Sequence, residues 1–469
     1  MKTSMGTLKT AYEIGSKRII EPVYKPVIKK DDNVISEEEI NTYVAKSNTV
    51  LPDYVTDINH PEGYRDERVN KKGDILVQSP ESIRYSDEIM EVHLNGNVMD
   101  YGGYGKMNRN IAFGLSNRNV RVKLDIEDYL VHVNQSTQKI LKDMSRNPVR
   151  PDAPKIYGVT VPLNISHKGM KIIFTMMETS EKIHPDYAGK LNLCDEIWVP
   201  THYGKTIFEQ SNVHPPIRVI PLGVDVERYK PGLEPFKFGM ALKGFRFISV
   251  FRWSYRKGYD VLLRSYLEEF SADDDVSLLL VSRSVDCPEH QGADRILEDF
   301  KAIREGIGKE DHELPHVALY NQPIPEQQMP SLYNAAHAFV LISRGEGFGL
   351  PYVEAAASGL PLIASNCSGQ SDFLEDDNAY LVEPEGFVTA EVTGNMHRMA
   401  KACRFYEGQP FPNFGASSIA QTQAHMRSVY ENYGEAQAKA VRLRETIVNN
   451  YTWNTMVDRV YNRLREIYN

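Results

Sequence analysis

Ser343–Ser365 reads SRGEGFGLPYVEAAASGLPLIAS, and this stretch decides the fold that we predict. The apolar run from His337 to Ile342 just before it predicts a buried strand, and Leu360–Ala364 near its end predicts another. Between these strands lie a loop with three glycines and a helix that Pro351 opens, because proline is favoured at a helix start. A strand, glycine loop, helix and strand in this order indicate a parallel α/β sheet.

The glycine loop has the properties of an anion site. Glycines let the backbone approach a ligand closely, and the free N–H groups of the helix start lie beside the loop. Glu346 lies in the loop and Glu354 on the helix, so we expect the two carboxylates to have separate roles rather than to form a hydrolase-style pair. The alternative, a tight turn followed by a solvated Glu354, stays open because glycine motifs alone are weak evidence.

The segment Glu346–Glu354 resembles the Glu-x7-Glu signature of retaining glycosyltransferases of family 4, and Ser343, Pro351, Ala355 and Gly359 also fit that pattern. The resemblance implies a B-type fold, an α/β architecture with two Rossmann-like domains whose parallel sheets face a central cleft. It also implies that Glu354 holds the ribose hydroxyls of a nucleotide-sugar and that Glu346 is catalytic beside the transferred sugar. The donor contacts would include the backbone around Gly347, Phe348, Gly349 and Leu350.

Bulk composition limits the class of protein. A chain of 469 residues exceeds the size of one core, so we expect two domains. Hydrophobic content of 41% and charged content of 25% are ordinary for a globular protein, and the net charge of −9 argues against nucleic acid as a partner or acceptor. We find no membrane-spanning run and no signal-peptide core, and the four scattered cysteines suit a reducing compartment. We therefore expect a cytoplasmic protein whose only membrane contact is peripheral, at the inner face.

The chain divides into five predicted parts. These are an extension (1–87), a first Rossmann-like domain for the acceptor (88–225), a linker rich in Pro and Gly (226–244), a second Rossmann-like domain for the nucleotide-sugar (245–451) and a terminal helix (452–469). The extension either packs over the first domain or is partly mobile, with partner or membrane contact through Lys2–Lys30 as the alternative. The terminal helix has one apolar face, and the resemblance implies that it crosses back to the first domain.

A glycine-containing turn follows the first strand of the first domain. Such a βαβ opening places backbone N–H groups at the carboxyl edge of a parallel sheet, although a simple tight turn is the alternative. The resemblance implies that Gly102 and Gly103 face the cleft and contact the donor phosphate or the acceptor. Tyr104, next to them, is a further candidate for contact with the acceptor or sugar.

Glu178 follows another predicted strand of this domain, Lys171–Met176. Ligands bind at such carboxyl ends, so Glu178 is a candidate contact for the acceptor or the sugar. Capping of the next helix is the alternative. Many members of the family have a histidine near this place, so this chain departs from the pattern.

Arg252 and Lys257 lie in the turn after the first strand of the second domain. Two cations there could each contribute about 1.5–3 kcal/mol to binding a diphosphate, although an isolated pair of this kind is usually solvated. The resemblance implies that both are catalytic, binding the donor pyrophosphate and stabilising the leaving group. Arg256 is extra, and we expect it in solvent. By position in the family, Asn321 and Gln322 contact the base of the nucleotide.

These features predict a metal-independent, retaining glycosyltransferase, a hexosyltransferase. It would move a sugar from a nucleoside diphosphate sugar, UDP- or GDP-linked, to a hydroxyl acceptor such as a glycan or lipid-linked glycan. No metal and no cofactor besides this co-substrate is expected. The alternatives are a nucleotide-sugar epimerase or phosphorylase on the same fold and a non-catalytic nucleotide-sugar-binding module.

Overall fold

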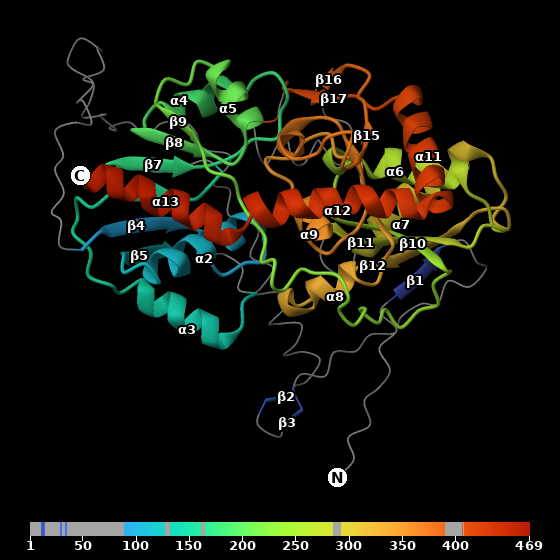
Figure 1. The fold of residues 1–469 in the computed structure, drawn as a ribbon, viewed down its shortest axis with the longest axis horizontal. Coiled ribbons are helices and arrows are strands. Elements are labelled where there is room, and N and C mark those ends of the chain that lie inside the picture. Colours follow the sequence, from blue (N-terminus) through green and yellow to red (C-terminus); the bar gives the residue numbers. More distant parts are fainter. Residues whose placement is uncertain are drawn as a thin grey trace. The chain divides into compact units, whose positions relative to one another are not determined.

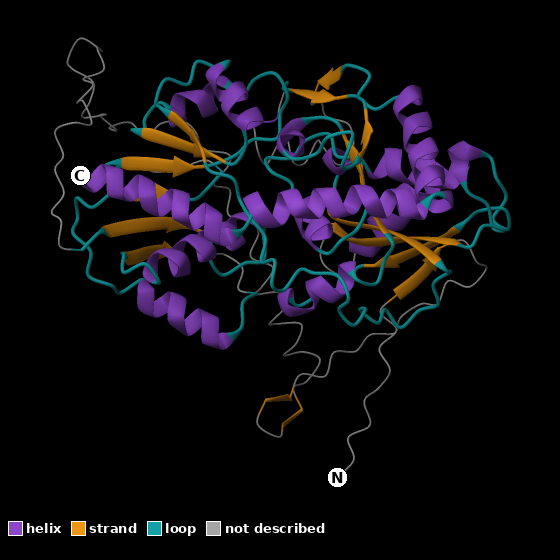
Figure 2. Cartoon of the chain, viewed as in Figure 1, coloured by secondary structure: helices purple, strands orange, loops and turns teal. Residues whose placement is uncertain are grey.

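The computed structural model describes residues 89–126, 132–160, 165–284, 292–389, 406 and 408–469, with three short strands near the N-terminus. The chain forms two compact units, and the smaller comprises Met1–Lys9 and Ile19–Ser82. Its described elements are the antiparallel strands β2 (Lys29–Lys30) and β3 (Asn33–Val34). The larger unit, Thr10–Arg18 with Ile83–Asn469, contains two mainly parallel sheets with helices around them (Figures 1 and 2).

The first sheet has six parallel strands in the order β5-β4-β6-β7-β8-β9. Since β4 has β5 on one side and β6 on the other, the chain changes direction across the sheet between β4 and β6. Loops at the carboxyl ends of such neighbouring strands form a natural ligand crevice. The elements of this part are β4 (Glu91–Gly96), α2 (Gly103–Ser116), β5 (Arg121–Ile126), α3 (Gln135–Met144), β6 (Lys155–Tyr157), β7 (Lys171–Phe174), α4 (Pro185–Leu191), β8 (Glu196–Val199), α5 (His202–Glu209) and β9 (Ile217–Val219).

The second sheet has the strand order β12-β11-β10-β13-β14-β15, all parallel, with β1 added antiparallel to β12. Its direction changes between β10 and β13, so the loops after these two strands flank the switch point of a doubly wound sheet. The strands are β1 (Ala11–Ile14), β10 (Phe245–Trp253), β11 (Val276–Ser284), β12 (His316–Tyr320), β13 (Ala338–Leu341), β14 (Leu362–Ser365) and β15 (Tyr380–Val382). The main helices are α6 (Tyr259–Glu269), α7 (Gly292–Ile307), α8 (Met329–Tyr333), α9 (Leu350–Ala357), α11 (Ala416–Glu431), α12 (Tyr433–Asn450) and α13 (Trp453–Tyr468).

The central strands are apolar along their length because helices cover both faces of a parallel sheet. In β11, Leu278, Leu279 and Leu280 are successive residues on alternating faces, and all three are buried. The strands β13 and β14 are buried throughout. This is why short apolar runs could be recognised as strands in the sequence, and the predicted α/β architecture with two parallel sheets is confirmed.

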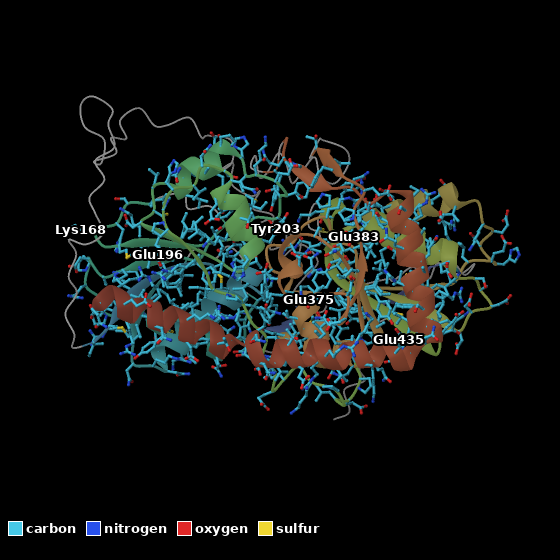
Figure 3. All side chains as sticks on the ribbon, turned by 45° about the horizontal axis from the view of Figure 1, so that its top comes forward. Lys168, Glu196, Tyr203, Glu375, Glu383 and Glu435 are labelled. Atoms are coloured by element: carbon cyan, nitrogen blue, oxygen red, sulfur yellow. The ribbon has the colours of Figure 1, made fainter. Side chains whose placement is uncertain are left out.

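The terminal helix α13 packs on the first sheet, as predicted (Figure 1). At its end, the Tyr468 hydroxyl donates to the carbonyl of Glu91 at 2.6 Å and accepts from its N–H at 2.9 Å. Arg463 pairs with the buried carboxylate of Glu196 on β8, labelled in Figure 3, at 2.6 Å. Helix α13 therefore binds β4, the first strand of this sheet in the chain, and β8, the neighbour of the edge strand β9.

The structure shows three features that the sequence analysis did not predict. Residues 11–14 do not pack on the first domain but extend the second sheet beside β12. A two-stranded sheet of β16 (Phe387–Thr389) and β17 (Pro410–Pro412) precedes the helices that dominate the end of the chain. Helix α3 was not predicted at all, because its sequence, QSTQKILKDM, has few apolar residues. The proposed contact through Lys2–Lys30 falls almost wholly outside the described residues.

Candidate functional site at the switch point of the second sheet

The loops after β10 and β13 meet at the switch point and bring Lys257 against Glu346. The Lys257 Nζ lies 2.5 Å from Glu346 Oε1, and both side chains are buried. The turn that carries Lys257 ends at Gly258, which has a φ of +66° and lies so close to β13 that a Cβ would be 1.8 Å from the carbonyl oxygen of Ile342. Only glycine allows this approach. The two loops are therefore packed backbone to backbone around the ion pair.

Burial and charge act in opposite senses on Glu346. Burial alone would raise the pKa of its carboxyl, but the cations of Lys257 and Arg256 outweigh this and hold the pKa below the ordinary value. For Lys257, burial lowers the pKa of the ammonium group, and Glu346 opposes part of the shift. The pair is thus an ionised acid beside a cation that gives up its proton more readily than an ordinary lysine.

Arg344 fixes the distance between the two loops. Its guanidinium is 1% exposed and binds both oxygens of Asp260 at 2.7 Å, the carbonyl of Tyr255 at 2.8 Å, and the face of the Tyr255 ring at 3.8 Å. The backbone N–H of Arg344 also donates to the carbonyl of Arg256 at 2.7 Å. A planar, bidentate clamp of this kind resists rotation and shear. Arg344 therefore holds the turn of Lys257 in register with the loop of Glu346.

The helix start beside Glu346 is also closely held. Gly349, with a φ of +96°, precedes α9, which begins at Leu350, so Pro351 is its second residue rather than its first. The N–H of Glu346 donates to the Ser368 hydroxyl at 3.0 Å, and the N–H of Gly369 donates to the Glu346 carbonyl at 2.9 Å. Phe348, a predicted donor contact, has a buried side chain against Phe373 and Tyr451. The helix start and the acidic loop are thus one rigid piece of backbone.

The first sheet contributes Glu178, which reaches the same place from the end of β7. Its carboxylate lies 3.6 Å from the guanidinium of Arg256 and accepts a hydrogen bond from the Tyr406 hydroxyl. The backbone of Glu178 packs closely on the glycine loop, since a Cβ on Gly345 would be 2.1 Å from its carbonyl oxygen. Charges therefore alternate across the two sheets, from Glu178 through Arg256 and Glu346 to Lys257.

Two expectations are corrected by this arrangement. Arg256 was expected in solvent, but its side chain is only 13% exposed and faces Glu178, because the short turn after β10 directs it toward the first sheet. Glu178 does not cap the next helix, since α4 has His184 as its N-cap residue, with its side chain accepting from the N–H of Asp186.

Arg252 and Lys257, which were predicted to act together, lie in different surroundings. Arg252 is the last residue but one of β10 and is exposed, whereas Lys257 is buried. Its assignment to the donor pyrophosphate stays a prediction. Asn321 and Gln322 follow β12, are half-buried and share a hydrogen bond of 3.1 Å, and their role at the base also stays a prediction.

Gly102, Gly103 and Tyr104 lie at the carboxyl edge of the first sheet. Gly102 is the N-cap residue of α2, and a Cβ on Gly103 would meet Leu350 of the second half at 3.5 Å. The Tyr104 hydroxyl lies 3.2 Å from that of Thr175 and accepts from the N–H of Met176, while burial raises its pKa to about 12. The predicted glycine turn therefore faces the start of α9.

Glu354, the second acid of the motif, lies on α9 and is buried rather than solvated. Its Oε1 is 2.5 Å from Nζ of Lys106 on α2, and its Oε2 accepts from the Tyr333 hydroxyl at 2.9 Å. Glu346 and Glu354 thus have separate partners, as the sequence analysis expected. The pairing with Lys106 was not predicted, because it joins residues of different sheets that are 248 positions apart.

A cavity of about 250 Å³ opens beside Glu354. Its walls are mainly polar and come from α2, α3, the linker, the segment around Glu326, α9 and the start of α13; they include Lys106, Arg109, Asn110, Arg228, Tyr229 and Glu354. Arg109 is buried and pairs with Glu326 at 3.3 Å, so it connects the two halves as well. Sequence reasoning missed this basic face of α2, although Lys106 and Arg109 follow directly on the glycine turn.

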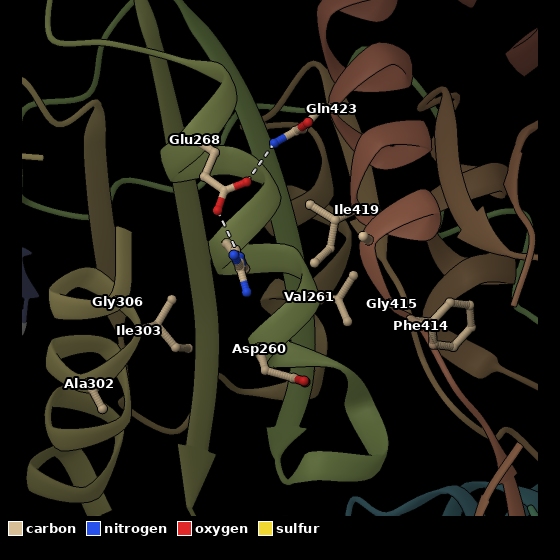
Figure 4. A pocket seen from close by; sticks show the side chains of 12 residues that line it. Asp260, Val261, Glu268, Ala302, Ile303, Gly306, Phe414, Gly415, Ile419 and Gln423 are labelled. Atoms are coloured by element: carbon tan, nitrogen blue, oxygen red, sulfur yellow. Dashed lines mark hydrogen bonds and ion pairs between the residues drawn. The ribbon is translucent and has the colours of Figure 1, made fainter. Parts of the chain in front are cut away.

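A larger cavity, of about 520 Å³, lies elsewhere, between α6, α7 and α11 (Figure 4). Apolar side chains such as Val261, Ile303 and Ile419 line it together with Asp260 and Glu268. None of the charged residues around Glu346 lines it, and of the residues described above only Asp260 does. We therefore locate the candidate site by its chemistry and not by the size of the hollow.

The described residues contain no group of three or more His, Cys, Asp or Glu side chains that could hold a metal ion. Cys194 and Cys367 are free thiols, while Cys287 and Cys403 lie outside the described ranges. No helix in the described part of the chain is long and apolar enough to cross a membrane.

Solved structures with the same architecture define the fold class. The chain is similar to sucrose-phosphate synthase from Thermosynechococcus elongatus, with a TM-score of 0.56 and 16% identity over 81% of this chain and 99% of that one. It is also similar to HepE from Anabaena in complex with UDP-glucose, with a TM-score of 0.53 and 13% identity over 80% of this chain and all of the other. The fold is thus the B-type fold of glycosyltransferases.

The sequence comparisons match one part of the chain to a family. Residues 243–399 match the family model described as "Glycosyl transferases group 1", which confirms the resemblance in this part of the chain. The D-inositol 3-phosphate glycosyltransferase of Corynebacterium diphtheriae is 29% identical over 159 residues, 33% of this chain and 35% of that protein. Mannosylfructose-phosphate synthase of Agrobacterium fabrum is 28% identical over 155 residues, 32% of each chain. The matches thus span about a third of the length of these relatives.

Proposed function

We propose that the chain is a retaining, metal-independent glycosyltransferase, a hexosyltransferase that uses a UDP- or GDP-linked sugar. The observation that carries this proposal is the buried Lys257–Glu346 pair at the switch point, next to the N-terminus of α9. The match to glycosyltransferase group 1 covers this part of the chain, and HepE, a protein of the same fold, binds UDP-glucose. Both support a nucleotide-sugar as the donor.

The chemical need is to stabilise a departing diphosphate. Lys257 and the start of α9 supply positive charge where that group would leave, and fixed charges in a dry site are effective there. Arg252, exposed near the end of β10, would add its charge from the solvent side. Glu346, held as an anion, orients the sugar and balances its developing positive charge. The bond from the anomeric carbon to the phosphate oxygen breaks, and the acceptor oxygen bonds to the same face. The leaving phosphate oxygen takes the acceptor's proton, so no protein base is needed.

The acceptor would lie at the carboxyl edge of the first sheet. Glu178 and Tyr104 lie there, and the turn of Gly102 and Gly103 approaches the start of α9 at Leu350. Glu178 also belongs to the charge chain that ends at Lys257, so acceptor binding and donor activation share one cluster. A glycan or lipid-linked glycan with a free hydroxyl suits this edge, and a lipid-linked acceptor would bring the protein to a membrane surface.

The test is incubation of the protein with a panel of nucleoside diphosphate sugars, with and without EDTA. We expect slow donor hydrolysis that releases free nucleoside diphosphate, unaffected by EDTA, and a product of retained anomeric configuration by NMR. Interconversion of donors would instead indicate an epimerase, and formation of a sugar phosphate only with added phosphate would indicate a phosphorylase. Binding without turnover would leave a nucleotide-sugar-binding module. Lys257→Met serves as the inactive control.

A further inference from the structure

The Tyr229 hydroxyl is a buried polar group without a hydrogen-bond partner among the described residues. Tyr229 lies in the linker, is 4% exposed and lines the cavity beside Glu354. Within the described part of the chain its hydroxyl makes no hydrogen bond. The Glu354 carboxylate lies near the phenol and, after burial, contributes to its raised pKa. A buried hydroxyl without a partner costs stability, so its retention calls for a reason.

The groups around this hydroxyl are those of a polar ligand pocket. Glu354 accepts from Tyr333 on one oxygen and pairs with Lys106 on the other, so Lys106 competes with a ligand hydroxyl for this carboxylate. The Tyr229 and Tyr333 rings are 6.0 Å apart between centroids, so the ring that lines the cavity packs beside the tyrosine that binds Glu354. Opening the Lys106–Glu354 pair would therefore uncover an acceptor and a phenol hydroxyl together.

We propose that Tyr229 is a donor-recognition residue whose hydroxyl binds a ribose hydroxyl of the nucleoside diphosphate, alongside Glu354. This inference rests on the proposed function, because it takes the ribose to be the ligand of Glu354. A vicinal diol needs both an acceptor and a group that can donate or accept, and a carboxylate with a phenol provides this set. The hydroxyl left without a partner in the protein is then satisfied by the substrate.

The chain offers a matched control in Tyr380 on β15. Its ring is also buried, and its hydroxyl also makes no hydrogen bond among the described residues, but it does not line the cavity. The variants Tyr229→Phe and Tyr380→Phe each remove one oxygen and leave the rings in place. Neither should lower the melting temperature, since neither breaks a hydrogen bond within the described protein.

Calorimetric titration of the full-length wild type and both variants with UDP, GDP, ADP and CDP tests the proposal. For the nucleotide that the wild type binds, we expect Tyr229→Phe to bind about three- to tenfold more weakly and Tyr380→Phe to bind normally. The difference between wild type and Tyr229→Phe should disappear with either the 2′-deoxy or the 3′-deoxy analogue, whichever lacks the contacted hydroxyl.

Several outcomes would overturn the inference. Equal binding by wild type and Tyr229→Phe, or a defect that persists with both deoxy analogues, removes the ribose contact while the proposed function stands. A melting temperature lowered only by Tyr229→Phe shows that the hydroxyl is structural. If the wild type binds none of the four nucleotides, the proposed function is overturned, and this inference with it.

Discussion

Two lysine–glutamate pairs in this protein have the same Nζ–Oε1 distance of 2.5 Å but different settings. Lys257–Glu346 joins two loops of one sheet, and Arg344, Gly258 and the backbone around Ser368 hold those loops together. Lys106–Glu354 joins α2 of the first sheet to α9 of the second and exists only while the two sheets keep their contact. The first pair is therefore fixed by contacts within one sheet, whereas the second depends on contact between the sheets, and we expect a ligand to open it.

Lys257→Met should produce the largest effect. It removes the buried cation of the fixed pair, and we expect turnover to fall at least about a hundredfold because a preorganised charge at the leaving group is lost. The buried Glu346 is also left unpaired, which costs about 3–5 kcal/mol. The double variant Lys257→Met with Glu346→Gln should recover stability but not turnover. A double variant that regains turnover would show that the pair is only structural.

The variants Arg256→Ala and Arg252→Ala distinguish the role of the arginine in the turn from that of the arginine near the end of β10. Arg256 is part of the charge chain and helps to keep Glu346 ionised, so its loss should lower both turnover, about ten- to a hundredfold, and the melting temperature. Arg252 is exposed, so its loss should lower turnover with an unchanged melting temperature. Steady-state kinetics and thermal unfolding of both variants measure this. Normal turnover of Arg252→Ala would remove its assignment to the pyrophosphate.

The contrast between these arginines shows where sequence reasoning ends. The motif and the turn located Lys257 and Glu346, since both lie in loops that follow apolar strands. Which of two nearby arginines faces inward depends on the geometry of the turn after β10, and the sequence alone does not specify that geometry. Lys106 could not be assigned because its partner is on the other sheet, and Tyr229 carries no motif. The fold was accessible because its buried strands are short apolar runs, while α3 has few apolar residues and β15 to β17 are each only three residues long.

The pH profile of turnover should reflect the fixed pair. Because burial lowers the pKa of Lys257 below its ordinary value of 10.5, the alkaline decline should begin earlier than for an exposed lysine and approach tenfold per pH unit. The lowered pKa of Glu346 keeps it ionised, and its contribution to stability should be lost only as the pH falls through a value under 4.5. In Lys257→Arg, whatever activity remains should lack the alkaline decline. An identical decline in that variant would assign the titration to another group.

Arg344→Lys tests how the fixed pair is held. Lysine keeps the charge but loses the bidentate contact with Asp260 and the stacking on Tyr255, so the two loops can shift. We expect turnover to fall about tenfold with a smaller change in donor KM, because Arg344 positions Lys257 and does not touch the donor. Arg264→Lys, on the exposed face of α6, is the matched control. A loss confined to KM would place Arg344 in donor binding instead.

Lys106→Met should have the smallest effect, and an effect of opposite sign, because it removes the pair that a ligand has to open. With Lys106 gone, Glu354 keeps only the Tyr333 hydroxyl as a partner and accepts a ribose hydroxyl without first losing an ion pair. We expect nucleoside diphosphates to bind about three- to tenfold more tightly, while the melting temperature falls because the buried Glu354 loses its cation, as Glu346 does in Lys257→Met. Glu354→Gln should weaken the same binding. Weaker binding by Lys106→Met would show that this lysine is itself a donor contact, and the distinction between a fixed pair and an opening pair would then fail.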